Sequence, residues 1–143
     1  MNPLEGVRIL DLTQVQSGPS CTQLLAWLGA EVIKIEEPGV GDRTRWEMAN
    51  KDKIDSFYFL VLNSNKNSLT LNLKSSDGIS ILGKLLEISD VIVENYAPGR
   101  MDSFGIGKEY ISTKYPHVVY ASIKGFGNDG PNSGLKSYES VAQ

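Results

Sequence analysis

The sequence is poor in cysteine and histidine, with one of each among its 143 residues. The single cysteine, Cys21, excludes an internal disulfide and any zinc site built on a Cys-x-x-Cys pair. We expect it to be a small buried apolar residue. The single histidine, His117, excludes sites that need two imidazoles, and its place between Pro116 and a strand predicts a surface role. No metal ligand cluster is visible, so no metal is expected.

Long apolar runs and an excess of basic residues are also missing. No stretch approaches the roughly 20 apolar residues of a membrane-spanning helix. The N-terminus, MNPLEGVRIL, lacks the basic and apolar regions of a signal peptide. Fourteen Lys and Arg against seventeen Asp and Glu give a net charge of −3, which disfavours a nucleic-acid partner. These absences predict a soluble cytoplasmic protein with neither membrane nor nucleic acid as partner.

Short apolar strands alternate with amphipathic helices along the chain. Strands are expected at residues 7–12, 32–36, 69–73, 91–93 and 118–123. A first helix is expected from a cap at Ser17 to Gly29, with an apolar face of Cys21, Leu24, Leu25 and Leu28. Further helices are expected from Ser75 or Ser76 to about residue 89, with two apolar stripes, and at residues 108–115 before Pro116. Residues 56–62 are a helix or a strand, and their composition does not decide which.

This alternation predicts an α/β fold with a Rossmann-like, doubly wound and mostly parallel sheet. Ligands bind such sheets beyond the carboxyl ends of the strands. The turns at that edge are residues 14–17, 36–45, 74–76, 95–98 and 124–130. Helix N-termini after Gln16, Lys74 and Asn95 suit phosphate groups, and Lys74 and Lys124 are candidates to add positive charge. The pattern therefore predicts a phosphate-bearing ligand at this edge.

The carboxylates offer weaker signals. Asp11 lies inside a strand, where a local structural role is expected, and Glu94 is expected to hold a turn. Glu139 follows the glycine-rich loop, within reach of the ligand edge. Glu36 ends the second strand, where a ribose-binding acid of an NAD site would stand. The first turn, QVQSGPS, lacks the GxGxxG glycines, so an NAD-binding module is a minor alternative.

Seven segments in order resemble the class III CoA-transferases of the CaiB/BaiF type, over essentially the whole chain. They are PLEGVRILDLT (3–13), SGP (17–19), LGAEVIKIE (28–36), GD (41–42), NKNSLTLNLKSSDG (65–78), DVIVENYAPG (90–99) and YASIKGFGNDGP (120–131). Gln16 before SGP and the ending LKSYESVAQ are most similar to the formyl-CoA transferase branch. The racemase branch has a histidine near Tyr138, and its absence here disfavours racemase chemistry.

The resemblance implies that residues 1–143 are a partial Rossmann-like CoA-binding domain, without the rest of the family's chain. It implies covalent catalysis, in which an aspartate attacks an acyl-CoA thioester and CoA passes to an acceptor carboxylic acid such as oxalate. That nucleophile lies beyond Gln143, so no turnover is expected from this chain alone. Supporting catalytic residues would be Gln16 and Glu139. The CoA-binding residues would be Gln16, Ser17, Leu71, Asn72, Leu73, Lys74, Asn95, Tyr96, Ala97 and Lys136.

Two positions depart from the family pattern. Glu37 replaces an arginine that follows IKIE, and Ser103 aligns with another arginine; Arg43, Arg45 and Arg100 are candidate replacements. The family forms interlocked homodimers, so self-association or a complementing chain is expected. The alternative to a CoA-transferase module is a non-catalytic remnant or interaction module, suggested by the two-sided apolar helix.

Overall fold

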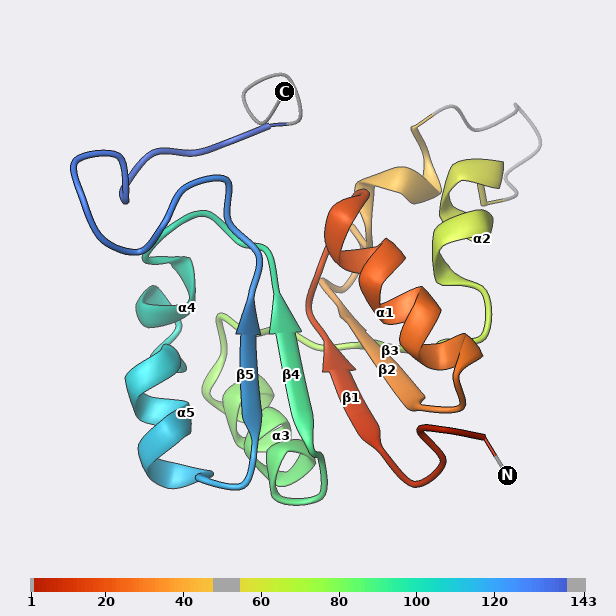
Figure 1. Ribbon diagram of the computed structural model, residues 1–143, viewed down its shortest axis with the longest axis horizontal. Helices are drawn as coiled ribbons and strands as arrows, with labels where there is room; N and C mark the ends of the chain where they lie inside the picture. The colour runs from red at the N-terminus through yellow and green to blue at the C-terminus, as the bar shows by residue number, and fades with distance from the viewer. Residues whose placement is uncertain (1, 48–54, 139–143) are drawn as a thin grey trace.

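The computed structural model describes residues 2–47 and 55–138 of the chain. A five-stranded sheet forms its centre, in the order β3-β2-β1-β4-β5, and all neighbouring strands are parallel (Figure 1). The strands are β1 (Arg8–Asp11), β2 (Glu31–Glu36), β3 (Asn67–Thr70), β4 (Val91–Glu94) and β5 (Val119–Ser122). The strand order reverses between β1 and β4, which makes the sheet doubly wound. The predicted α/β fold is confirmed.

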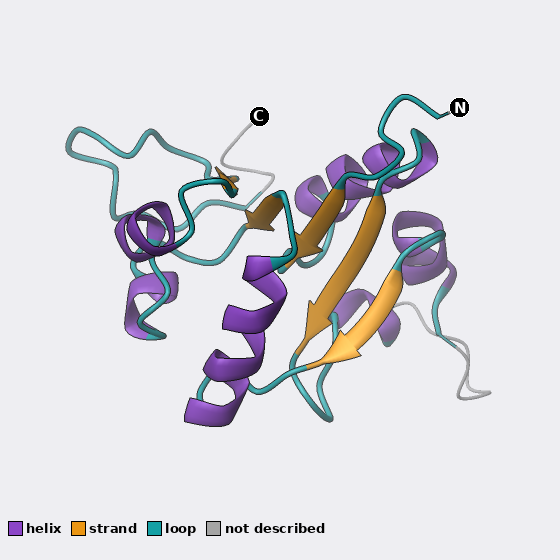
Figure 2. Ribbon diagram, turned by 90° about the horizontal axis from the view of Figure 1, so that it is seen from below, coloured by secondary structure: helices purple, strands orange, loops and turns teal. Residues whose placement is uncertain are grey.

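Helices cover both faces of the sheet (Figure 2). Helices α1 (Ser17–Trp27) and α2 (Phe57–Asn63) lie on one face, together with the short 3₁₀ helix η1 (Arg43–Arg45). Helices α3 (Ser76–Glu87), α4 (Arg100–Ser103) and α5 (Lys108–Lys114) lie on the other. Because side chains alternate along a strand, Leu10 of β1 packs toward α3 to α5, whereas Ile9 packs toward α1.

The buried face of α1 differs from the predicted one. Leu24 is 56% exposed, and Cys21 and Leu28 are exposed as well, so the predictions for these residues were wrong. The helix turns Thr22 and Ala26 toward the sheet instead. Ala26 is small enough for close packing, and the Thr22 hydroxyl donates to a buried carboxylate. The buried face of α1 is therefore the one that supplies a hydroxyl donor to this carboxylate, and not the one predicted from the spacing of apolar residues.

The structure decides two points that the sequence left open, the conformation of residues 56–62 and the residue that caps α3. Residues 57–63 are helical, and the Ser56 hydroxyl caps them by accepting from Phe59 N at 3.1 Å. Ser75 caps α3 in the same way, as predicted. Only one of the two predicted stripes of α3 is buried, since Ile81 and Ile88 are exposed.

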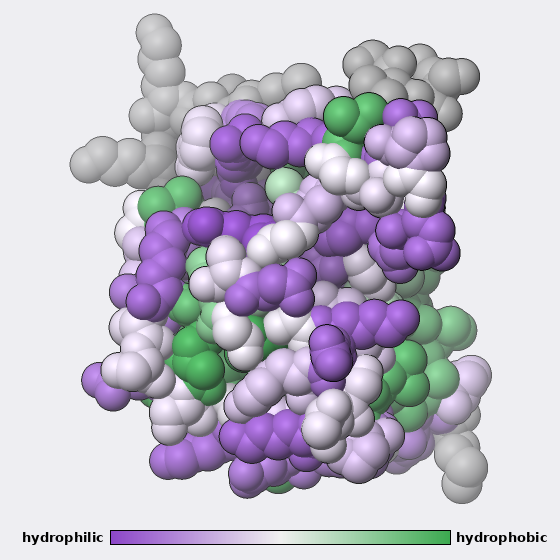
Figure 3. Space-filling view, turned by 90° about the vertical axis from the view of Figure 1, so that its left-hand side faces the viewer, coloured by the Kyte–Doolittle hydropathy of each residue, from purple (hydrophilic) through white to green (hydrophobic). Residues whose placement is uncertain are grey.

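Several boundaries also differ. Helix α1 begins at Ser17 with Gln16 in the cap position, one residue earlier than expected. Strand β3 ends at Thr70, although Leu71 and Leu73 remain buried in the turn beyond it. The helix expected after Asn95 is α4, which begins at Arg100; its range was not predicted. The face that carries α4 and α5 is largely hydrophilic, with separate small apolar areas (Figure 3). Within residues 2–47 and 55–138, every helix is too short or too polar to cross a membrane.

Candidate functional site

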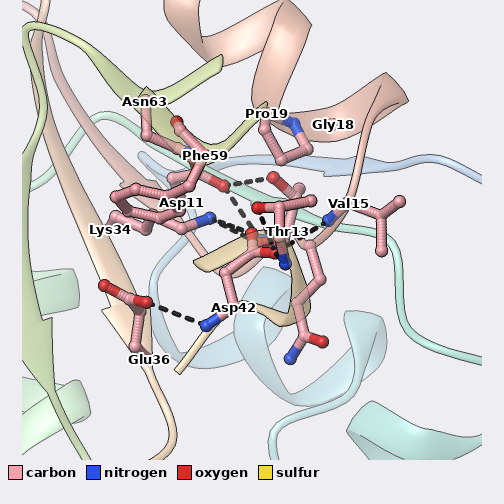
Figure 4. A network of polar contacts seen from close by, with 12 residues as sticks. Asp11, Thr13, Val15, Gly18, Pro19, Lys34, Glu36, Asp42, Phe59 and Asn63 are labelled. Atoms are coloured by element: carbon pink, nitrogen blue, oxygen red, sulfur yellow. Dashed lines mark hydrogen bonds and ion pairs between the residues drawn. The ribbon is translucent and has the colours of Figure 1, made fainter. Parts of the chain in front are cut away.

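Two lysines and two aspartates have buried side chains beneath the turn that follows β1, and Figure 4 shows three of them, Asp11, Lys34 and Asp42. Lys34 Nζ is 2.8 Å from Asp42 Oδ2, and Lys66 Nζ is 3.0 Å from Asp11 Oδ2. All four side chains are at most 1% exposed. Each buried charge therefore has a partner of opposite sign, as burial requires. In the described part of the chain, His, Cys, Asp and Glu side chains form no group of three or more suited to a metal ion.

Asp11 is the centre of this network. Its carboxylate accepts from Thr13 N at 2.9 Å, from the Thr13 hydroxyl at 2.5 Å and from the Thr22 hydroxyl at 2.6 Å. Burial alone would raise the pKa of Asp11, but the charges of Lys34 and Lys66 and the two hydroxyls lower it overall. Asp11 thus stays ionised at neutral pH. Its predicted structural role is confirmed.

The network fixes the turn after β1 from both sides. Asn95, just after β4, accepts from Gln14 N at 2.9 Å and donates to Gln14 O at 2.8 Å. Asp42 accepts from Val15 N at 3.3 Å. Val15 has a φ of +67°, a left-handed conformation that is a rare outlier for a β-branched residue. Such strain persists only where surrounding contacts enforce it.

Helix α1 starts directly on this turn because residue 18 is glycine. A Cβ atom at Gly18 would lie 2.3 Å from Thr13 Cβ, so a larger residue would push the helix away. Gln16 and Ser17 are exposed at the start of α1. Within the described residues, no side chain caps this helix, so its N-terminal N–H groups are placed to bind an anion at the carboxyl edge of the sheet.

A pocket opens at this edge, between the ends of β2, β3 and β4 and helix α4. It is lined by Gln14, Ile35, Glu36, Glu37, Leu71, Asn72, Leu73, Lys74, Tyr96, Arg100 and Phe104. Five of the residues predicted to contact CoA, Leu71 to Lys74 and Tyr96, therefore share one pocket. They come from segments more than 20 residues apart, which the sheet topology brings together.

The remaining predicted residues lie outside this lining. Gln16 and Ser17 follow Gln14 along the chain, at the start of α1. The Asn95 side chain is already engaged at both ends by Gln14, which makes it a clamp for the turn. Ala97 is half-buried in the same loop.

The last two predicted site residues, Lys136 and Glu139, lie near the C-terminal end of the chain. Lys136 is exposed, and the next residue, Ser137, packs against Gly125 beyond β5. This contact keeps Lys136 near the carboxyl end of that strand. Glu139 lies outside the described residues. The roles of these side chains therefore stay predictions.

The charges around the pocket are mostly paired. Lys124 Nζ lies 2.8 and 2.7 Å from the two carboxylate oxygens of Glu94 and donates to Tyr96 O at 2.6 Å. It therefore holds the loop and is not the free phosphate-binding charge that the sequence suggested. Glu94 also accepts from Tyr96 N at 2.9 Å, as its predicted turn-holding role requires. Burial, then Glu37, raises the pKa of Tyr96 to about 12, so its hydroxyl stays protonated.

Glu36 is likewise occupied. Arg45 donates to both of its carboxylate oxygens, at 2.8 and 2.6 Å, and Ser68 donates at 2.6 Å. Burial alone would raise the pKa of Glu36, but these hydrogen bonds and one from Asp42 N lower it to about 2. A carboxylate held in this way is not available to a ribose hydroxyl, which argues against the NAD alternative.

The side of the pocket formed by α4 was the part that the sequence predicted least. The Arg100 guanidinium lies 4.4 Å over the Phe104 ring, and Tyr96 meets the same ring edge-on at 6.0 Å. Of the three arginines considered as replacements, Arg100 lines the pocket, whereas Arg45 is bound to Glu36 and Asp55. The spacing of Arg100 and Phe104, one helical turn apart, was the available signal.

Comparison with known proteins places this geometry in a family. The model of CoA-transferase family III matches residues 4–143. Formyl-CoA:oxalate CoA-transferases from Escherichia coli O157:H7 (strain EC4115 / EHEC) and Shigella boydii serotype 18 are each 50% identical over 141 residues, which cover 99% of this chain and 34% of each relative. The chain thus spans about a third of the length of these relatives.

Solved structures agree with this assignment. A CAIB/BAIF family protein from Brucella suis is 32% identical with a TM-score of 0.90, covering 99% of this chain and 38% of that one. A hypothetical protein (Rv3272) from Mycobacterium tuberculosis is 35% identical with a TM-score of 0.86, covering 97% and 37%. Sequence and fold together show that the chain belongs to CoA-transferase family III.

Proposed function

We propose that these 143 residues provide the CoA-binding part of a CoA-transferase. The observation that carries this proposal is the pocket at the carboxyl edge, which gathers Leu71 to Lys74 and Tyr96 beside the start of α1. The pocket offers a nucleotide-containing thioester a cationic side chain, Lys74, and an apolar wall. The N-terminal N–H groups of α1, which no side chain caps, lie beyond Gln14 at the same edge of the sheet. The 50% identity to formyl-CoA:oxalate CoA-transferases supports the same chemistry.

The proposed reaction moves CoA between an acyl-CoA of the formyl-CoA type and a carboxylic acid such as oxalate. Gln16, on the strained turn, is proposed to face the thioester, and Glu139 to stand near the reacting groups. The nucleophile in this proposal is an aspartate that the family's chain carries C-terminal to the position of Gln143. A homodimer, or assembly with a complementing chain, is part of the same proposal.

Titration calorimetry of the purified chain with CoA tests this function. Saturable binding of CoA, with no heat from NAD under the same conditions, is the expected result. Circular dichroism first establishes that the chain is folded, so that absent heat is informative. A folded chain that binds NAD and not CoA, or neither ligand, contradicts the proposal.

A further inference from the structure

The pocket contains one ion pair that a phosphate-bearing ligand has to meet. Glu37 follows β2, and its Oε1 lies 2.5 Å from Lys74 Nζ. Both side chains line the pocket, and both are about half exposed, at 44% and 54%. The ammonium best placed for a phosphate is therefore already held by a carboxylate of this chain.

Other cations near the pocket do not replace Lys74. Lys124 is bound to Glu94, and Arg45 is bound to Glu36. Arg100 lines the pocket, but its guanidinium is stacked over Phe104 on the α4 wall. A phosphate that enters this pocket thus finds Lys74 and Arg100 as cationic side chains in the lining, and the Glu37 carboxylate already occupies Lys74.

Resting on the proposed function, we propose that Glu37 is a built-in competitor of CoA, whose carboxylate is displaced from Lys74 when a CoA phosphate binds. The exchange is physically accessible because an exposed ion pair contributes little stability. The phosphate gains a charge-assisted contact with Lys74, while Glu37 turns to solvent. Glu37 therefore sets the affinity of the pocket, making it weaker for CoA than the same pocket without a carboxylate at this position.

The test uses Glu37→Gln, with Glu31→Gln as a matched control. Glu31 begins the strand that Glu37 follows, is 46% exposed and pairs with Arg8 at 2.6 Å. Both substitutions remove one negative charge from an exposed ion pair, at opposite ends of β2. Glu37→Gln is expected to tighten CoA binding by roughly fivefold, which corresponds to the attraction in water between the Glu37 and Lys74 charges that the phosphate no longer has to displace. Glu31→Gln is expected to leave it unchanged.

A double substitution tests whether Glu37 acts through Lys74. Lys74→Gln is expected to weaken CoA binding, and adding Glu37→Gln then gives less gain than it does in the original chain. An equal gain in both backgrounds means repulsion through space and overturns the displacement. Calorimetry at fixed ionic strength gives all four affinities, and thermal unfolding confirms that each variant is folded.

The results separate this inference from the proposed function. Tighter CoA binding by Glu37→Gln than by both the original chain and Glu31→Gln supports the inference. CoA binding that is the same in the original chain and Glu37→Gln overturns the inference and leaves the proposed function standing. No CoA binding by the original chain or by any folded variant overturns both.

Discussion

Replacing Asp42 by alanine is expected to destabilise the fold strongly. Asp42 is fully buried and faces the Lys34 ammonium, which also donates to Thr13 O at 2.9 Å. Removing one member of a buried ion pair leaves an uncompensated charge and costs about 3–5 kcal/mol. For a chain of this length that lowers the melting temperature by roughly 10–15 °C.

Substituting the other partner is expected to cost less. In Lys34→Met, Asp42 still accepts from Thr44 N at 3.0 Å and from the Thr44 hydroxyl at 2.8 Å. We expect a loss of about 1–3 kcal/mol, as for a buried group that keeps part of its hydrogen bonding. Combining both substitutions is expected to cost clearly less than the sum of the two, because neither charge is then left alone.

Urea unfolding followed by far-ultraviolet circular dichroism measures these values. The control is Glu31→Ala, which breaks an exposed pair with Arg8 and is expected to cost no more than about 1 kcal/mol. A loss for Asp42→Ala no larger than this control, or strict additivity in the double variant, refutes the reasoning. Either result means that the charges beneath the β1 turn are solvated or do not interact.

Three further outcomes follow from the structure. Leu82→Ala in α3 is expected to lower the free energy of unfolding by about 2–5 kcal/mol because Leu82 is fully buried. Leu24→Ala in α1 is expected to change it by no more than about 0.5 kcal/mol because Leu24 is 56% exposed. Equal losses for the two variants in urea unfolding contradict the assigned buried face of α1. The lowered pKa of Glu36, about 2 against 4.5, means stability that is present above pH 4.5 and lost as pH falls toward 2, worth about 3 kcal/mol; Glu36→Gln is expected to flatten this loss, and an unchanged acid profile contradicts it. Gly18→Ala is expected to lose about 1–3 kcal/mol of stability, because the added Cβ meets Thr13; a gain, as alanine gives in an unconstrained helix, contradicts the close approach.

The order of helices and strands was readable because each element carries its own local signal. Ser75 caps α3 through its own hydroxyl, and Pro116 follows the end of α5. The burial of α1 was not readable in this way. Its orientation is decided by Asp11, a residue of another element that draws Thr22 inward. Helix α4 is four residues long, so the spacing of Arg100 and Phe104 is its one periodic pair, too little to predict its range.

The candidate site shows the same difference between local signals and contacts that join distant parts of the chain. The segment from Leu71 to Lys74 was found from a motif, because its residues are contiguous. The pairing of charges was not found, since it joins residues far apart in the chain. Lys124 looked free in the sequence, yet it is bound to Glu94, 30 residues earlier. Composition shows which charges exist, and only the sheet topology shows which remain for a ligand.

The central claim is that CoA binds at the carboxyl edge of the sheet, and backbone amide NMR of the ¹⁵N-labelled chain tests it most directly. Addition of CoA is predicted to shift amides of residues 14–17, 71–75 and 95–98 together. Amides at the opposite ends of the strands, such as those of Arg8 and Glu31, are predicted to stay in place. Saturable shifts confined to that opposite edge, or no shifts at all in a folded chain, contradict the claim.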